Sequence, residues 1–143
     1  MTFLTLIRGN FIISMVSLLL IKKHEQYFLV EDDQAIREIL ETVLISENYD
    51  VRSFSTVRAF AQRDHSVNPD LYILDVMLPD GSGIDLCAQL KKDIKNKDVP
   101  IIIMSAHAQL RHFSALCQPN DFISKPFDID NLLMKVQEML DKN

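Results

Sequence analysis

Residues 71–83 read LYILDVMLPDGSG, and this stretch decides the fold class. Its first four residues are apolar without alternation, which predicts a strand that is buried on both faces, as in a parallel sheet covered by helices. Asp75 closes the strand, and the turn residues 79–81 (PDG) follow shortly afterwards. The stretch therefore predicts a buried strand that delivers a carboxylate to the edge of a sheet.

Apolar runs and amphipathic segments alternate on both sides of this stretch. The other predicted strands are Tyr27–Val30, Tyr49–Phe54, Val99–Met104 and Asp121–Ser124. The predicted helices are 36–44 with Asp33 as N-cap, 55–62, 83–95 with Ile84, Cys87, Leu90 and Ile94 directed inward, 109–117, and 129–140 with Asp128 as cap. Five strand–helix units predict a doubly wound α/β domain with a five-stranded parallel sheet.

The charge argues against a nucleic-acid partner. The net charge is −5 at pH 7, and no run of Lys or Arg is longer than two residues. Proteins that bind nucleic acid through its phosphates present a basic patch or stripe. We therefore expect no nucleic-acid partner.

The cysteines and histidines predict no metal site. Cys87 and Cys117 form no CxxC motif and lie among apolar residues, so we expect buried free thiols in a reducing compartment. The four histidines are scattered along the chain. We assign no metal to them.

The first 24 residues differ from the rest of the chain. Residues 11–21 (FIISMVSLLLI) are an apolar run of eleven, shorter than the about 20 residues that a membrane span needs. The lysines at 22–23 stand where a signal peptide would have its small-residue cleavage site. We expect residues 1–24 to be a disordered or loosely packed extension. A helix that packs on the domain or on a partner, and a membrane anchor, are the alternatives.

The predicted strands end in residues that suit one chemistry. If the sheet is parallel, the carboxyl ends of its strands meet at one edge, where the crevice of such folds lies. The residues at these ends are Glu31-Asp32-Asp33, Asp75, Ser105 and Lys125. Each alone is a common turn former, helix cap or surface charge, but four strand ends carry the set together.

These side chains fit magnesium-assisted phosphoryl transfer. Clustered carboxylates repel one another, and a hard divalent cation such as Mg²⁺ relieves that repulsion while sharing its shell with a phosphate. Asp75 at the open edge suits a nucleophile for phosphorus. Lys125 supplies a positive charge and Ser105 a hydroxyl donor for phosphoryl oxygens.

At these residues the sequence resembles the receiver domains of two-component response regulators, of the CheY-like type. The matching motifs are FLVEDD at 28–33, LYILDVMLPDGSG at 71–83, VPIIIMSA at 99–106 and DFISKPF at 121–127. The resemblance assigns residues 25–143 to a receiver domain and residues 1–24 to an N-terminal extension. It implies a flavodoxin-like sheet with strand order 2-1-3-4-5.

The resemblance also implies roles for single residues. These are Asp75 as phosphoacceptor, Asp32, Glu31 and Asp75 as Mg²⁺-binding acids, Met77 as a backbone carbonyl ligand, Ser105 and Phe122 as switch residues, and Lys125, with a cis bond to Pro126, as the phosphate-binding lysine. Two features depart from the family pattern: Gln118-Pro119-Asn120 replaces a Gly-Ala-Asp-type stretch, and Phe122 lacks a hydroxyl. Neither touches the acid cluster.

The implied function is a two-state switch without enzymatic activity beyond its own phosphorylation and dephosphorylation. A sensor histidine kinase or histidine phosphotransfer protein supplies the phosphoryl group. The face made by the fourth helix, fifth strand and fifth helix then binds an output protein. Three residues follow the last predicted helix, so we expect no output domain, and we expect a cytoplasmic protein without a membrane partner.

Three alternatives come from other classes. A Mg²⁺-dependent phosphatase with an aspartyl nucleophile normally has Asp-x-Asp after its first strand, which residues 31–33 do not supply. A flavodoxin-like FMN carrier would have a Ser, Thr and Gly-rich loop there. A receiver-like module that binds partners without phosphorylation is the third.

Overall fold

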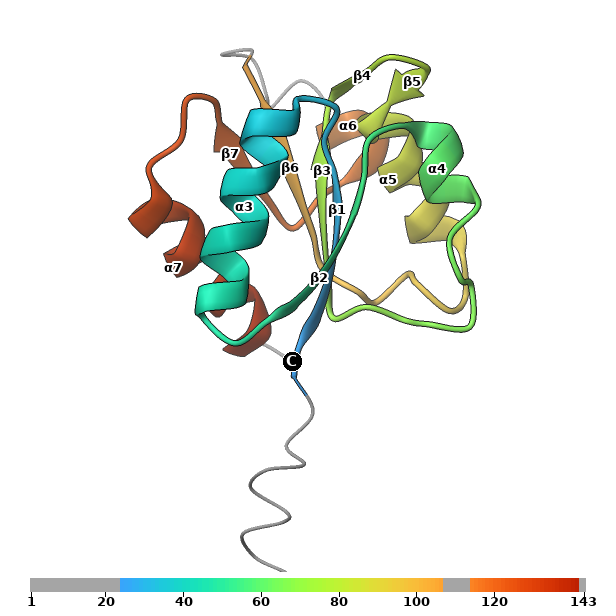
Figure 1. Ribbon diagram of the computed structural model, residues 1–143. Helices are drawn as coiled ribbons and strands as arrows, with labels where there is room; N and C mark the ends of the chain where they lie inside the picture. The colour runs from blue at the N-terminus through green and yellow to red at the C-terminus, as the bar shows by residue number, and fades with distance from the viewer. Residues whose placement is uncertain (1–23, 107–113, 142–143) are drawn as a thin grey trace, which may run out of the picture.

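The computed structural model describes residues 24–106 and 114–141, and its centre is a parallel sheet of five strands (Figure 1). The spatial order is β2-β1-β3-β6-β7, which confirms the predicted order 2-1-3-4-5 and the flavodoxin-like fold class. The strands are β1 Gln26–Val30, β2 Asp50–Phe54, β3 Leu71–Asp75, β6 Ile101–Ser105 and β7 Asp121–Ser124.

The three central strands are apolar because they are covered on both faces. All five residues of β3 and of β6 are buried, and residues 27–30 of β1 have no exposed surface. The edge strands β2 and β7 are partly exposed and carry more polar residues. Continuous apolar runs thus mark the buried centre of the sheet, as predicted.

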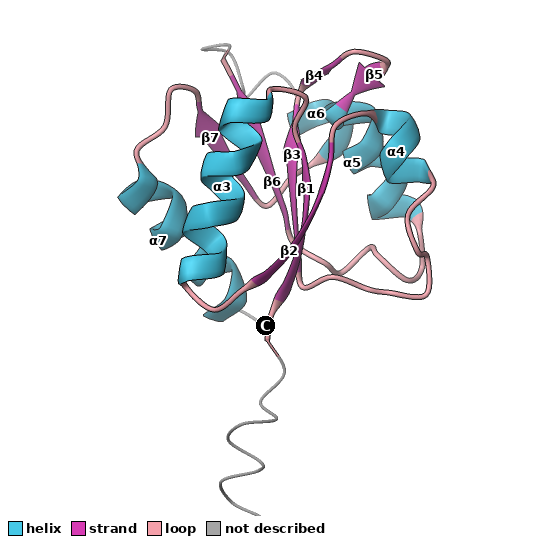
Figure 2. Cartoon of the chain, in the orientation of Figure 1, coloured by secondary structure: helices cyan, strands magenta, loops and turns pink. Residues whose placement is uncertain are grey.

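Helices cover both faces of the sheet, one layer on each face (Figure 2). One face carries the long-helix layer, α3 Gln34–Ser46 and α7 Ile129–Asp141. The other carries the short-helix layer, α4 Val57–Ala61, α5 Gly83–Lys92 and α6 Ser114–Cys117. A small antiparallel hairpin, β4 Met77–Leu78 with β5 Gly81–Ser82, joins β3 to α5.

The two predicted helix caps, Asp33 and Asp128, are confirmed, although α3 begins at Gln34 rather than 36 and α4 at Val57 rather than 55. The Asp33 carboxylate accepts the backbone N–H of Ile36 at 3.1 Å at the start of α3. The Asp128 carboxylate accepts the N–H of Asp130 at 3.0 Å at the start of α7. Such side-chain acceptors satisfy N–H groups that have no partner within the helix.

The end of α5 differs from the prediction. The helix ends at Lys92 rather than Lys95, and Ile94 is 84% exposed instead of directed inward. The Asp93 carboxylate accepts the backbone N–H of Lys95 at 3.1 Å and also bonds the side-chain amide of Asn96. This side-chain acceptor competes with helical hydrogen bonding and turns the chain.

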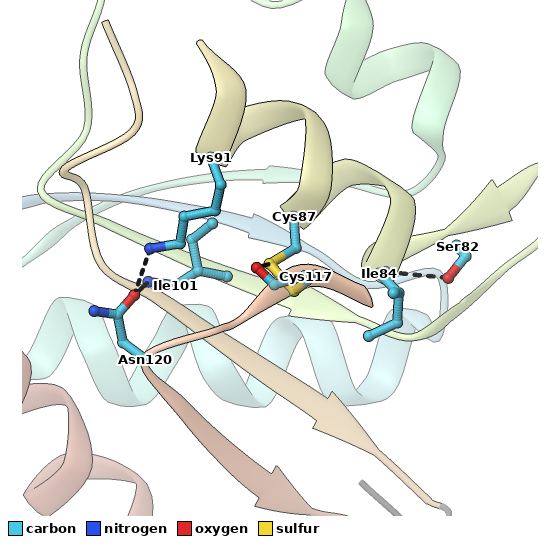
Figure 3. The surroundings of a disulfide bond; sticks show 7 residues. All are labelled: Ser82, Ile84, Cys87, Lys91, Ile101, Cys117 and Asn120. Atoms are coloured by element: carbon cyan, nitrogen blue, oxygen red, sulfur yellow. Dashed lines mark hydrogen bonds between the residues drawn. A yellow bond between two sulfur atoms is a disulfide. The ribbon is translucent and has the colours of Figure 1, made fainter. Parts of the chain in front are cut away.

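The prediction of free thiols is wrong, because Cys87 and Cys117 form a disulfide between α5 and α6 (Figure 3). Burial of both residues was predicted correctly. The pairing carries no local signal, since the two cysteines are 30 positions apart in sequence and only the packing of α6 on α5 brings their Cα atoms to 5.6 Å.

The described residues include no helix long and apolar enough to cross a bilayer. The interpretations of the apolar run at 11–21 lie outside the described residues, as does most of the predicted helix 109–117.

Candidate functional site

The carboxyl ends of the central strands meet at one edge of the sheet. Parallel pairing sets Val30 of β1 beside Leu74 of β3, so Glu31 and Asp75 follow at the same level. On the other side, Asp75 pairs with Met104 of β6. The register therefore converts residues far apart in sequence into neighbours.

Three carboxylates gather at this edge. One oxygen from each of Glu31, Asp32 and Asp75 lies within 4.8 Å of the other two. Glu31 is 0% and Asp75 5% exposed, whereas Asp32 is exposed. The cluster is thus buried at its base and open to solvent at Asp32.

Lys125 enters the cluster from the end of β7. Its Nζ lies 3.1 Å from Asp75 Oδ2 and donates a hydrogen bond to Glu31 Oε1. Burial alone would lower the pKa of Lys125, but the hydrogen bonds and charges of Glu31 and Asp75 outweigh it and hold this pKa above its ordinary value.

The pKa of Glu31 is also shifted, because its charged form is disfavoured. Its burial and the neighbouring Asp75 carboxyl raise the pKa of Glu31 to about 7, against the lowering effect of Lys125. One ammonium group therefore does not fully compensate the two buried acids. A further positive charge at this edge would relieve their repulsion.

The oxygens of the cluster fit a hard divalent cation. Glu31 Oε2 is buried, and among the described residues it has no hydrogen-bond partner. A buried carboxylate oxygen without a partner is costly unless a cation or water meets it. Three carboxylates with one side open to water match the oxygen ligands and retained waters of Mg²⁺ better than the nitrogen and sulfur ligands of zinc.

The structure places the remaining predicted residues at different distances from the cluster. Ser105 is buried at the end of β6, and its carbonyl accepts the backbone N–H of Lys125 at 2.8 Å. Phe122 of β7 is half-buried and packs on the side of the short-helix layer, not at the acids. Met77 lies two residues after Asp75 with an exposed side chain. The bond from Lys125 to Pro126 is cis, as predicted.

Two supporting residues were missed by the sequence analysis. The first is Gly83, whose N–H donates to Val76 O at 3.1 Å. A Cβ at this position would lie 2.1 Å from the Asp75 backbone oxygen. Only a residue without a side chain lets α5 start this close to Asp75, and a glycine opening a helix directly after a serine cap was the signal.

The second is Arg37 of α3. Its Nη1 donates to the backbone carbonyls of Glu31 at 2.8 Å and Asp32 at 3.2 Å, which fixes the turn that carries both acids. A cation near a helix N-terminus is disfavoured by the helix dipole. An arginine one turn into a helix is therefore a signal of a specific contact.

Curated relatives match most of this chain. The transcriptional regulatory protein CssR of Bacillus subtilis is 38% identical over 115 residues, which are 79% of this chain and 50% of that protein. GltR of Pseudomonas aeruginosa is 37% identical over 114 residues, 78% of this chain and 47% of the relative. The chain spans about half the length of these relatives.

Solved structures superpose on this chain. A response regulator from Chloroflexus aurantiacus superposes with a TM-score of 0.77 at 29% identity, covering 83% of this chain and 99% of that one. The response regulator TrrA of Thermotoga maritima, solved in complex with Mg²⁺-BeF, gives 0.71 at 30% identity, covering 81% and 99%.

The sequence pattern of one family covers most of the described fold. The model of the response regulator receiver domain matches residues 27–137, from β1 into α7. This range includes the three acids and Lys125. The chain belongs to the response regulator receiver domain family of two-component systems.

Proposed function

We propose that this chain is a phosphorylation-activated receiver that accepts a phosphoryl group on Asp75, with residues 25–143 as the receiver and 1–24 as an extension. The observation that carries the proposal is the buried acid cluster with Lys125 Nζ 3.1 Å from Asp75 Oδ2. Receiver domains catalyse only their own phosphoryl transfer and generally pair with histidine kinases.

Glu31, Asp32 and Asp75, together with the backbone carbonyl of Met77, would hold Mg²⁺. When bound, the ion supplies positive charge that neutralises phosphoryl oxygens during transfer. Glu31 Oε2 supports this assignment, because in the described part of the chain it is a buried acceptor without a hydrogen-bond partner, on a carboxylate that lies beside the other two acids.

The side chains of the protein provide the nucleophile and its positioning. A carboxylate oxygen of Asp75 attacks phosphorus, the bond from phosphorus to the donor breaks, and the donor leaves with the electron pair. For a phosphohistidine donor, the leaving group is the imidazole nitrogen. Lys125 already contacts Asp75 and takes a second phosphoryl oxygen, while the Ser105 hydroxyl donates to a third.

The signal to an output protein passes through β7, the strand beside Ser105. Attraction of Ser105 toward the phosphoryl group lets Phe122 move inward, and the face made by α6, β7 and α7 changes shape. The donor is a sensor histidine kinase or histidine phosphotransfer protein, and the output partner is a protein that binds this face. A partner shifts the switch only as far as its affinities for the two states differ. Receiver domains are typically cytoplasmic, and we propose the same for this chain.

The test is labelling by a small phosphodonor with and without Mg²⁺. We expect Mg²⁺-dependent label that is acid-stable and alkali-labile in the wild type and absent in Asp75→Asn. Asp98→Asn removes an exposed carboxylate away from the site and is the matched control, expected to label normally. Equal labelling of Asp75→Asn and wild type would contradict the choice of acceptor. Absence of label from the wild type would favour a receiver-like module that works without phosphorylation.

A further inference from the structure

The cysteine pair lies where a covalent tie would act on the proposed output face. Cys87 is in the middle of α5 with no exposed surface, and Cys117 ends α6 with 6% of its surface exposed. We propose that Cys87 and Cys117 are a reversible dithiol–disulfide site that tethers α6 to α5 and exchanges with small anionic disulfides through a surface hollow beside Cys117.

The hollow gives Cys117 a route to solvent. It has a volume of about 250 Å³ and is lined by Ala88, Lys91, Lys92, Leu116, Cys117 and Gln118. Cys87 does not line it and lies behind Cys117, in the core. Exchange therefore starts at Cys117, and Cys87 acts as the resolving thiol.

The charge of the hollow selects the reagent. Lys91 and Lys92 line one wall, on a protein whose net charge is −5. Ammonium groups near a thiol favour the reactive thiolate. The same groups attract a disulfide that carries carboxylates, and they repel a cationic one.

The chemistry balances as thiol–disulfide exchange. The Cys117 thiolate attacks one sulfur of the small disulfide RSSR, which forms a mixed disulfide and releases one RS⁻. The Cys87 thiol, after losing its proton, attacks the Cys117 sulfur and releases the second RS⁻. Both protons end on the released thiols, so two electrons pass from the protein to RSSR, and excess RSH reverses the sequence.

The tether acts on the approach to β7. Four residues after Cys117, β7 begins at Asp121. Between them lies Asn120, whose side-chain oxygen accepts hydrogen bonds from Lys91 Nζ at 2.8 Å and from the backbone N–H of Ile101 at 2.9 Å (Figure 3). These two bonds form a polar link from the segment before β7 to α5 and β6. Opening the disulfide leaves this polar link to hold the segment. Its effect on signalling rests on the proposed function, because β7 carries Phe122.

The first experiment counts thiols in the intact protein. The wild type is equilibrated with glutathione at different ratios of thiol to disulfide, then alkylated and weighed. We expect a reversible passage between zero and two reactive thiols. Accumulation of a stable mixed disulfide in the wild type, or two thiols at every ratio, would overturn the proposal.

Two single variants test the order of attack. Cys87→Ser keeps the accessible thiol and should trap glutathione on Cys117. Cys117→Ser keeps the buried thiol and should react at least roughly tenfold more slowly. Equal rates would contradict entry through the hollow. The wild-type thiol counts decide the matter even if Cys87→Ser folds poorly.

Two variants that each remove one positive charge test the role of the lysines in the hollow. Lys92→Gln should slow exchange with glutathione disulfide by roughly threefold and leave exchange with cationic cystamine unchanged or faster. Lys97→Gln removes the same charge from an exposed position that does not line the hollow, and should change neither rate. Equal slowing by both variants would contradict a local effect.

Hydrogen exchange measures the tether. We expect amides of residues 114–124 to exchange at least roughly tenfold faster in the reduced than in the oxidised wild type. Asp75 is labelled in parallel. Label without any difference in thiol counts or exchange refutes the tether and leaves the proposed function. A redox-dependent difference without label refutes the proposed function and leaves the tether.

Discussion

The two helix layers cover the same sheet by different means. In the long-helix layer, α3 and α7 have 13 residues each and bury apolar side chains against the sheet, namely Leu40, Leu44, Leu132, Val136 and Met139. In the short-helix layer, α4 has 5 residues and α5 has 10, and the described part of α6 is Ser114–Cys117. Short helices are marginal in water and depend on tertiary contacts.

The short-helix layer compensates with specific links. The disulfide joins α5 to α6, and the Asp80 carboxylate accepts the N–H groups of Val57 and Arg58 at 2.8 and 2.9 Å, which holds α4 to the β4–β5 hairpin. Phe122 packs in this layer too. The layer nearest the proposed switch is therefore the one held by a few discrete contacts. Loss of a single contact should lower the free energy of unfolding more in this layer than in the other.

The largest expected effect is that of reducing the disulfide. Cross-links that close a loop of this length stabilise by about 3–4 kcal/mol in the chain-entropy account, since the sequence separation is 30. Urea unfolding with and without reductant measures the difference in free energy of unfolding. Equal stability of the two forms would contradict the view that the short-helix layer depends on its links.

The next effect comes from Gly83→Ala. The new methyl group would overlap the Asp75 backbone oxygen, so α5 must shift, at a cost of about 2–3 kcal/mol. Gly81→Ala is the matched comparison, because its Cβ would meet a methyl group of the Val57 side chain at 2.9 Å rather than a backbone atom, so a smaller shift relieves the overlap. Equal destabilisation of the two variants in urea would show that the close approach at Asp75 is not what matters.

Most of the architecture follows from the sequence, for physical reasons. Unbroken apolar runs such as 71–74 have no polar face to expose, which fixes a covered parallel sheet, and such a sheet collects its strand ends at one edge. Asp33 and Asp128 mark helix starts because their carboxylates accept the first free N–H groups.

What could not be predicted depends on packing between distant segments. No spacing rule pairs Cys87 with Cys117, because only the docking of α6 on α5 brings them together. Ile94 fits the helical period, but the polar turn at Asp93 takes it out of the helix. The contact of Gly83 with Asp75 is likewise invisible until β3 and α5 are placed in space.

A third test concerns the acid cluster at the edge of the sheet, independently of the two helix layers. Because burial raises the pKa of Glu31 from 4.5 to about 7, the folded metal-free protein binds the Glu31 proton more tightly than the unfolded chain. The stabilisation of the folded state that this tighter proton binding provides is complete below pH 4.5 and is lost as pH rises through 7. The wild type should therefore lose stability relative to Glu31→Gln between pH 5 and about 8 without Mg²⁺. A constant difference between the two across that range, in urea unfolding, would contradict it.

The smallest expected effect compares two strained positions, one in each layer. Gln118 has φ 57° after α6, in the left-handed region that favours glycine, and Asn48 has φ 66° after α3. Asparagine tolerates this region better than glutamine. Gln118→Gly should raise the free energy of unfolding by about 0.5–1 kcal/mol, and Asn48→Gly should change it less. A larger gain at Asn48 would reverse the comparison.

The central claim is that Asp75, alone among the clustered acids, takes the phosphoryl group. Borohydride reduces an acyl phosphate of aspartate to homoserine, and peptide mass mapping then locates the modified position. We predict homoserine at position 75 after Mg²⁺-dependent labelling. Homoserine at position 32, or a reduced glutamyl product at position 31, with Asp75 unmodified would contradict the account.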